Sequence, residues 1–235
     1  MSETFRMYLE IGFNTFYLIV IWSITAVMLS RKKRLTAGEW NKARPWVIGL
    51  ALLALGDTGH VGFRIVAYAM GDLAATPSLG GFSLPLVGTG ALATAVTVTI
   101  LYFLMLEGWR LRNDKSRSVV YWLFCALLLF RLVIMLFPQN QWAEIVPPFG
   151  WSLFRNIPLT VVGICLATFF LREGFKQSDS FQKRVGLWIC LSFLFYLPVI
   201  LFVQKIPLVG MLMIPKTVAY LLIALEVKNN YFPKK

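Results

Sequence analysis

Seven segments of about 20 mostly apolar residues, joined by short connections, dominate the sequence. About 20 consecutive apolar residues are what one helix needs to cross the hydrocarbon core of a bilayer. Apolar residues make up 58% of the chain and charged residues only 14%, whereas soluble domains carry about 25% charged residues. We therefore predict an all-α, polytopic membrane protein in which residues 1–235 form one seven-helix bundle. The expected helices span residues 11–29, 45–70, 82–106, 119–137, 151–171, 185–203 and 206–227.

The basic residues predict the orientation of this bundle. Most of the 23 Lys and Arg residues lie in residues 31–44, 110–117, 172–184 and 228–235. Short loops rich in Lys and Arg remain cytoplasmic, so we expect the N-terminus outside and the C-terminus in the cytoplasm. The net charge of +12 then reflects topology and attraction to anionic lipids. No recognition motif accompanies the basic segments, so we expect no binding to nucleic acid.

Other sequence features bear on location and assembly. The first apolar segment has no basic stretch before it and no small-residue cleavage site after it, so it does not have the pattern of a cleavable signal peptide. The sequence has no Asn-x-Ser/Thr sequon, and we expect a bacterial cytoplasmic membrane. Three cysteines, Cys125, Cys165 and Cys190, lie within apolar segments and are expected to pack without a disulfide. We expect a monomer or a homodimer.

Small residues and a short connection predict how some helices meet. The third segment is rich in small residues, beginning with Gly88 and Gly90. Small residues let helices approach closely in lipid, so we expect this helix to be central. Only residues 204–205 separate the sixth and seventh segments, which predicts a tight antiparallel hairpin.

Ionisable residues inside the apolar segments predict a functional site. Such residues are costly in a membrane and usually face the bundle interior or a cavity. In the second segment, steps of three and four place Asp57, His60 and Arg64 on one helical face. Counted along their helices, the ionisable residues inside the segments and the neighbouring Asn156 all fall at the midplane or in the outer half of the membrane. We therefore predict an outward-facing pocket lined by Asp57, His60, Arg64, Arg131, Arg155, Asn156 and Lys216.

The charges of these residues indicate the kind of guest. Four cations face one aspartate, which favours a small anionic or zwitterionic molecule or a lipid headgroup. We expect Arg131 and Lys216 to supply the positive charge, Asp57 to balance Lys216 or bind an amine, and His60 to make binding pH-sensitive. The role would be receptor-like or carrier-like. Two structural alternatives stay open: Arg64 and Arg155 can reach outer phosphates, and Asp57 can form a purely structural tie with Lys216.

Three chemical functions are alternatives to ligand binding. Asp57 could orient His60 as a general base in an intramembrane lipid-modifying enzyme, although no nucleophile is evident. A catalytic zinc ion needs three protein ligands, and with one histidine in the chain we expect no metal. Lys216 in the seventh segment resembles the retinal-binding lysine of rhodopsins. Microbial rhodopsins, however, carry an acidic residue one turn earlier, where this chain has Leu212. We therefore expect no cofactor, with retinal on Lys216 as the alternative.

Three short segments also resemble a family of uncharacterised bacterial seven-helix integral membrane proteins. They are the Gly-Asp-Thr-Gly-His-Val-Gly-Phe-Arg-Ile run at residues 56–65, the Arg-Asn-Ile-Pro run at 155–158, and residues 210–217 ending in Ile-Pro-Lys-Thr. The similarity covers most of the chain and implies a bacterial origin and a seven-helix bundle. Members of that family often have Pro directly before the arginine of the first motif, where this chain has Phe63. The resemblance implies no particular activity.

Overall fold

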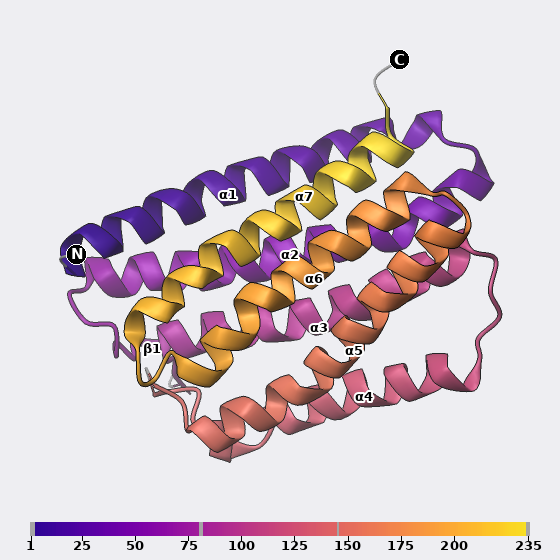
Figure 1. Ribbon diagram of the computed structural model, residues 1–235. Coiled ribbons are helices and arrows are strands. Elements are labelled where there is room, and N and C mark those ends of the chain that lie inside the picture. Colours follow the sequence, from indigo (N-terminus) through magenta and orange to yellow (C-terminus); the bar gives the residue numbers. More distant parts are fainter. Residues whose placement is uncertain (1–2, 80–81, 145, 234–235) are drawn as a thin grey trace.

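The computed structural model describes residues 3–79, 82–144 and 146–233. Seven α-helices in these residues run alternately up and down and pack side by side (Figure 1). Short 3-10 helices lie at Lys32–Arg34, Pro138–Asn140 and Pro207–Leu212, and strands β1 (Ser78–Leu79) and β2 (Phe82–Ser83) pair antiparallel with Ser78 opposite Ser83. The helices are α1 (Glu3–Arg31), α2 (Ala37–Ala69), α3 (Leu86–Arg112), α4 (Val119–Met135), α5 (Phe149–Lys176), α6 (Ser180–Phe202) and α7 (Met213–Tyr231).

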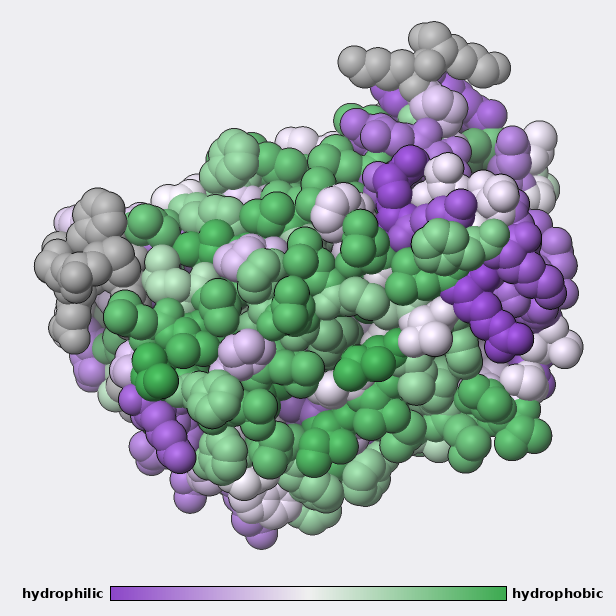
Figure 2. All heavy atoms as spheres, in the orientation of Figure 1, coloured by the Kyte–Doolittle hydropathy of each residue, from purple (hydrophilic) through white to green (hydrophobic). Residues whose placement is uncertain are grey.

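Length and surface composition identify a helical membrane bundle. In the described part of the chain, six helices are long and apolar enough to cross a membrane, and α4 is an apolar helix of 17 residues. Hydrophobic side chains cover the middle of the visible face, and hydrophilic side chains gather towards its ends (Figure 2). The predicted all-helical membrane fold is therefore confirmed.

Several predicted helix boundaries are wrong, and α2 shows why. The sequence places its start at Pro45, but the helix begins at Ala37. A capping box starts it there: Glu39 N donates to the Thr36 hydroxyl, and Thr36 N donates to the Glu39 carboxylate at 2.8 Å. Pro45 lies inside the helix, where it removes one main-chain hydrogen bond without ending the helix.

The third and seventh helices also begin later than predicted. Residues 82–83 form β2, and α3 starts only after its N-cap residue, Pro85. After α6, the chain turns within residues 203–206 and forms a 3-10 helix before α7 begins at Met213. The predicted tight hairpin between the last two helices is confirmed, but its returning arm is only partly α-helical.

Glycines bring α2 and α3 together, as the small residues of the third segment predict. A Cβ atom added at Gly90 would lie 2.7 Å from His60 Cα, closer than real Cβ contacts allow. A Cβ atom at Gly56 would overlap the Thr97 side chain. The backbones are therefore close enough that only glycine fits at these two positions.

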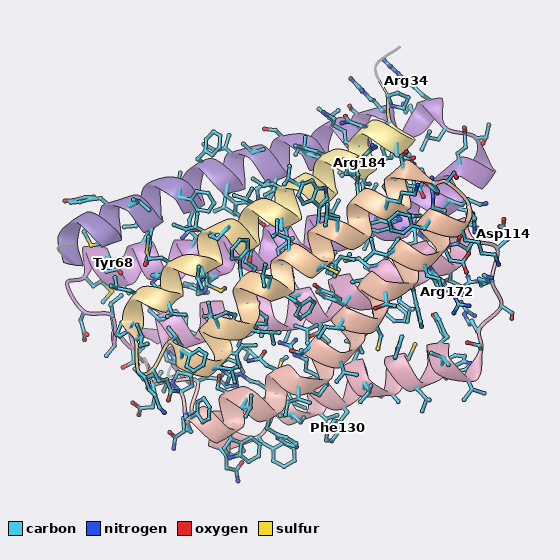
Figure 3. The ribbon with its side chains drawn as sticks, in the orientation of Figure 1. Arg34, Tyr68, Asp114, Phe130, Arg172 and Arg184 are labelled. Atoms are coloured by element: carbon cyan, nitrogen blue, oxygen red, sulfur yellow. The ribbon has the colours of Figure 1, made fainter. Side chains whose placement is uncertain are left out.

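Hydrogen bonds and ion pairs close one end of the bundle, which we call the basic end because residues 31–44, 110–117, 172–184 and 228–233 lie there (Figure 3). Arg112 Nε donates to the Asp179 carboxylate at 2.7 Å, and Arg112 Nη1 donates to the Tyr231 hydroxyl at 3.1 Å. Arg31 Nη1 donates to the Phe232 carbonyl at 2.7 Å. Partial burial raises the pKa of Asp179, but hydrogen bonding and charge attraction from Arg112 outweigh it and hold that pKa below its ordinary value.

Candidate functional site

The seven predicted site residues lie towards the end opposite the basic end, in three neighbouring groups rather than around one pocket. Arg131, Arg155 and Asn156 join α4 and α5, Asp57 and Lys216 lie deeper on α2 and α7, and His60 and Arg64 face a pocket beside α1. The three groups differ in their contacts, and these contacts indicate a different role for each group.

Arg131 is buried, with 2% of its surface exposed, and its hydrogen bonds go to neutral oxygens of the protein. Nε donates to the Arg155 carbonyl at 2.9 Å, and Nη1 donates to the Ala95 carbonyl at 2.8 Å and to the Thr99 hydroxyl. Nη2 donates to Asn156 Oδ1 at 3.4 Å. A guanidinium has five N–H donors, so most of this one is already used. Its geometry favours tying α3, α4 and α5 together.

Arg155 and Asn156 extend this group towards the loop after α4. Arg155 Nη1 donates to Asn140 Oδ1 at 3.2 Å, and its guanidinium lies 4.2 Å from the centre of the Trp142 ring. Asn156 Oδ1 also accepts a hydrogen bond of 2.9 Å from the Tyr196 hydroxyl of α6. These contacts hold the α4–α5 corner in place and connect it to α6.

Asp57 is held by two hydroxyl groups that the sequence did not point to. Tyr17 of α1 donates to Oδ2 at 2.7 Å, and Thr94 of α3 donates to Oδ1 at 3.1 Å. Tyr17 is 2% exposed, and a hydroxyl group in the middle of an apolar segment is the one signal that could have identified it. Asp57 forms no hydrogen bond with His60 in the described structure.

Lys216 lies among aromatic rings. Its Nζ is 4.1 Å from the centre of the Tyr196 ring and 5.6 Å from that of Tyr220. Within the described residues, no carboxylate oxygen lies within 4.0 Å of Nζ, so Asp57 and Lys216 do not form a direct ion pair. Cation–π attraction stabilises the ammonium group here.

His60 and Arg64 line a pocket between α1 and α2. His60 Nδ1 and Arg64 Nε are both buried, and neither has a hydrogen-bond partner in the described part of the protein. Leaving a buried polar atom unpaired costs about 1–3 kcal/mol. Two of the residues that line the pocket therefore have hydrogen-bonding capacity that no described residue uses. The described residues that line it are Glu10, Ile11, Asn14, His60, Val61, Arg64, Ile65 and Tyr68.

The pocket lies near the end of a helix that is longer than a bilayer core is thick. The 33 residues of α2 correspond to about 50 Å at 1.5 Å per residue, against about 30 Å of hydrocarbon. Arg64 lies about 8 Å along the axis from the last residue of α2, Ala69. Tyr68, at the same end of the molecule (Figure 3), lies almost at the helix end. The pocket therefore reaches from the end of the helix towards its middle.

The described residues contain no group of three or more His, Cys, Asp or Glu side chains that could hold a metal ion. Comparison of the chain with known protein families, with curated proteins and with solved structures found no match. Fold and site together define a polytopic helical membrane protein with a small pocket between its first two helices, lined by both polar and apolar side chains.

Proposed function

We propose that this protein is a receptor-like or carrier-like membrane protein that binds a small anionic or zwitterionic molecule or a lipid headgroup. The single observation that carries the proposal concerns His60 and Arg64, which both line the pocket between α1 and α2. Each has a buried nitrogen atom, Nδ1 and Nε respectively, without a hydrogen-bond partner among the described residues. An arginine is well suited to phosphate or carboxylate oxygens because its N–H groups match their geometry. Arg64 is thus the main anion contact.

The other charged residues support this site at different depths. Lys216 and Asp57 place one charge of each sign deeper in the bundle, and Asp57 is fixed by Tyr17 and Thr94. Arg131 acts as a positioning residue that keeps α3 to α5 in register. In this proposal the basic end faces the cytoplasm of a bacterial cell, and the pocket faces outwards.

The closed basic end favours a receptor-like role over a carrier-like one. A carrier must open a path on both sides of the membrane. On the cytoplasmic side, the contacts of Arg112 with Asp179 and Tyr231 would have to break. A receptor needs only a shift in these contacts.

The two chemical alternatives require rearrangements. A lipid-modifying enzyme that uses Asp57 and His60 needs these side chains to meet, and Asp57 is instead hydrogen-bonded to Tyr17 and Thr94. Retinal bound to Lys216 needs space around Nζ, which lies against the rings of Tyr196 and Tyr220.

Native mass spectrometry of the gently purified protein tests the proposal. We expect one non-covalent guest per chain on the wild type and on Lys205→Gln, a control at an exposed position of the same end, and loss of that guest in Arg64→Gln. A wild type without a guest after purification with phospholipid present would contradict the proposal. A covalent adduct of retinal mass on Lys216 would replace it with the retinal alternative.

A further inference from the structure

The pocket lies on the side of the bundle rather than in its centre. The described residues that line it all belong to α1 and α2, and α1 packs mainly along α2 and α7 at the edge of the molecule (Figure 1). Ile65, one of the lining residues, is 38% exposed. A guest can therefore enter from the surrounding bilayer without passing between the central helices.

The pocket combines polar and apolar side chains near one end of α2. Arg64 and Tyr68 lie in the last turns of α2, a helix about 20 Å longer than the hydrocarbon core is thick. The wall also carries the apolar side chains Ile11, Val61 and Ile65. A lateral pocket with polar groups at its end and apolar groups in its wall suits a phospholipid better than a free ion.

The charges in the wall specify the kind of headgroup. Arg64 and Glu10 bring one charge of each sign to the same pocket, which matches a zwitterion better than a net anion. Glu10 also interacts within the protein, but a carboxylate has about four lone-pair sites and can accept further hydrogen bonds. The Asn14 side chain adds a carbonyl acceptor beside it.

Resting on the function proposed above, we infer that the pocket binds the headgroup of a zwitterionic phospholipid with a primary amine, as in phosphatidylethanolamine. Arg64 Nε donates to the phosphate, and so does His60 Nδ1 in the tautomer that carries the proton on Nδ1. Glu10 and Asn14 accept from the ammonium group. A primary ammonium has three N–H donors, whereas the trimethylammonium of phosphatidylcholine has none and phosphatidylglycerol carries no positive charge. The pocket therefore discriminates by the amine.

The test uses native mass spectrometry of the full chain with phosphatidylethanolamine, phosphatidylcholine or phosphatidylglycerol of identical acyl chains. For the wild type we expect binding of phosphatidylethanolamine about tenfold tighter than the other two, which corresponds to about 1.4 kcal/mol. Glu10→Gln should bring the three affinities to within about twofold, a difference of only about 0.4 kcal/mol. Arg64→Gln should weaken all three, and Arg64→Lys should restore part of the binding.

Controls and outcomes separate this inference from the proposed function. Glu144→Gln and Lys205→Gln remove exposed charges at the same end and should keep the wild-type order of affinities, and thermal unfolding shows whether each variant is folded. Equal binding of the three lipids, lost in Arg64→Gln but unaffected by Glu10→Gln, overturns the amine inference and leaves the function standing. If soluble phosphoethanolamine displaces the lipid at equal concentration, the inference that the headgroup belongs to a phospholipid is overturned. A folded wild type that binds none of these probes overturns both.

Discussion

Arg131 Nε donates a hydrogen bond of 2.9 Å to the main-chain carbonyl of Arg155, so one buried arginine is held by the backbone of another. This carbonyl lies in the second turn of α5. The partners of the guanidinium are carbonyl and hydroxyl oxygens instead of a carboxylate. Arg131 therefore has a structural role, which is to connect α3, α4 and α5.

Arg131→Met tests this role. The substitution removes the hydrogen bonds that the guanidinium donates to the carbonyls of Arg155 and Ala95. We expect a loss of about 1.5–3 kcal/mol in the free energy of unfolding, the contribution of a hydrogen bond that involves a charged group. Guest binding measured on the protein that remains folded should be unchanged. If stability is unaffected and the guest is lost, Arg131 contacts the guest directly.

The contact between Tyr17 and Asp57 should couple α1 to α2 energetically. Tyr17→Phe removes the 2.7 Å donor to the buried carboxylate, and we expect a loss of about 1–3 kcal/mol in unfolding free energy. In a double-mutant cycle with Asp57→Asn, the double variant should lose less unfolding free energy than the sum of the two single variants, because each single substitution removes the same interaction. Strictly additive losses would show that the hydroxyl contributes through packing alone.

Gly90 and Gly62 form a matched pair for testing the close approach of α2 and α3. A Cβ atom at Gly90 meets the backbone of His60, whereas one at Gly62 meets nothing within 4 Å. Gly90→Ala should cost about 1–3 kcal/mol in unfolding free energy, and Gly62→Ala should be neutral or stabilise by up to about 1 kcal/mol through helix propensity. Similar effects of the two substitutions on thermal unfolding would contradict the packing described here.

The Asp179–Arg112 pair predicts a dependence of stability on pH. Because the pKa of Asp179 in the folded protein is below its ordinary value, the carboxylate adds stability that is fully present above the unfolded pKa of about 4. That contribution is lost as the pH falls through the lower folded pKa. The unfolding temperature of the wild type should therefore fall more steeply below about pH 4 than the unfolding temperature of Asp179→Asn. Parallel pH profiles would show that the pair adds nothing.

The sequence predicted the helices well and their ends poorly, for a physical reason. Apolar length indicates where a helix crosses the membrane, but the ends depend on local capping, as in the Thr36–Glu39 box that starts α2 before Pro45. Close approach at Gly90 was predictable because small residues have few other uses in an apolar helix.

The candidate site was predictable as a set of residues but not as a set of contacts. Spacing placed Asp57, His60 and Arg64 on one face, yet Asp57 turns to Tyr17 and Thr94 while His60 and Arg64 line the pocket with α1. Main-chain carbonyls are present at every position, so no side-chain pattern could show that they hold Arg131. Partners from distant segments became visible only in the folded bundle.

The packing of α1 against α7, secured by the hydrogen bond from Arg31 to the Phe232 carbonyl, has a consequence for biosynthesis. During translation α1 enters the membrane first, while α7 emerges only after five further helices. The surface of α1 that packs on α7 must therefore contact lipid, or an insertion factor, until α7 has been inserted. The helix α1, which forms one wall of the pocket, therefore completes its packing only when α7 has docked.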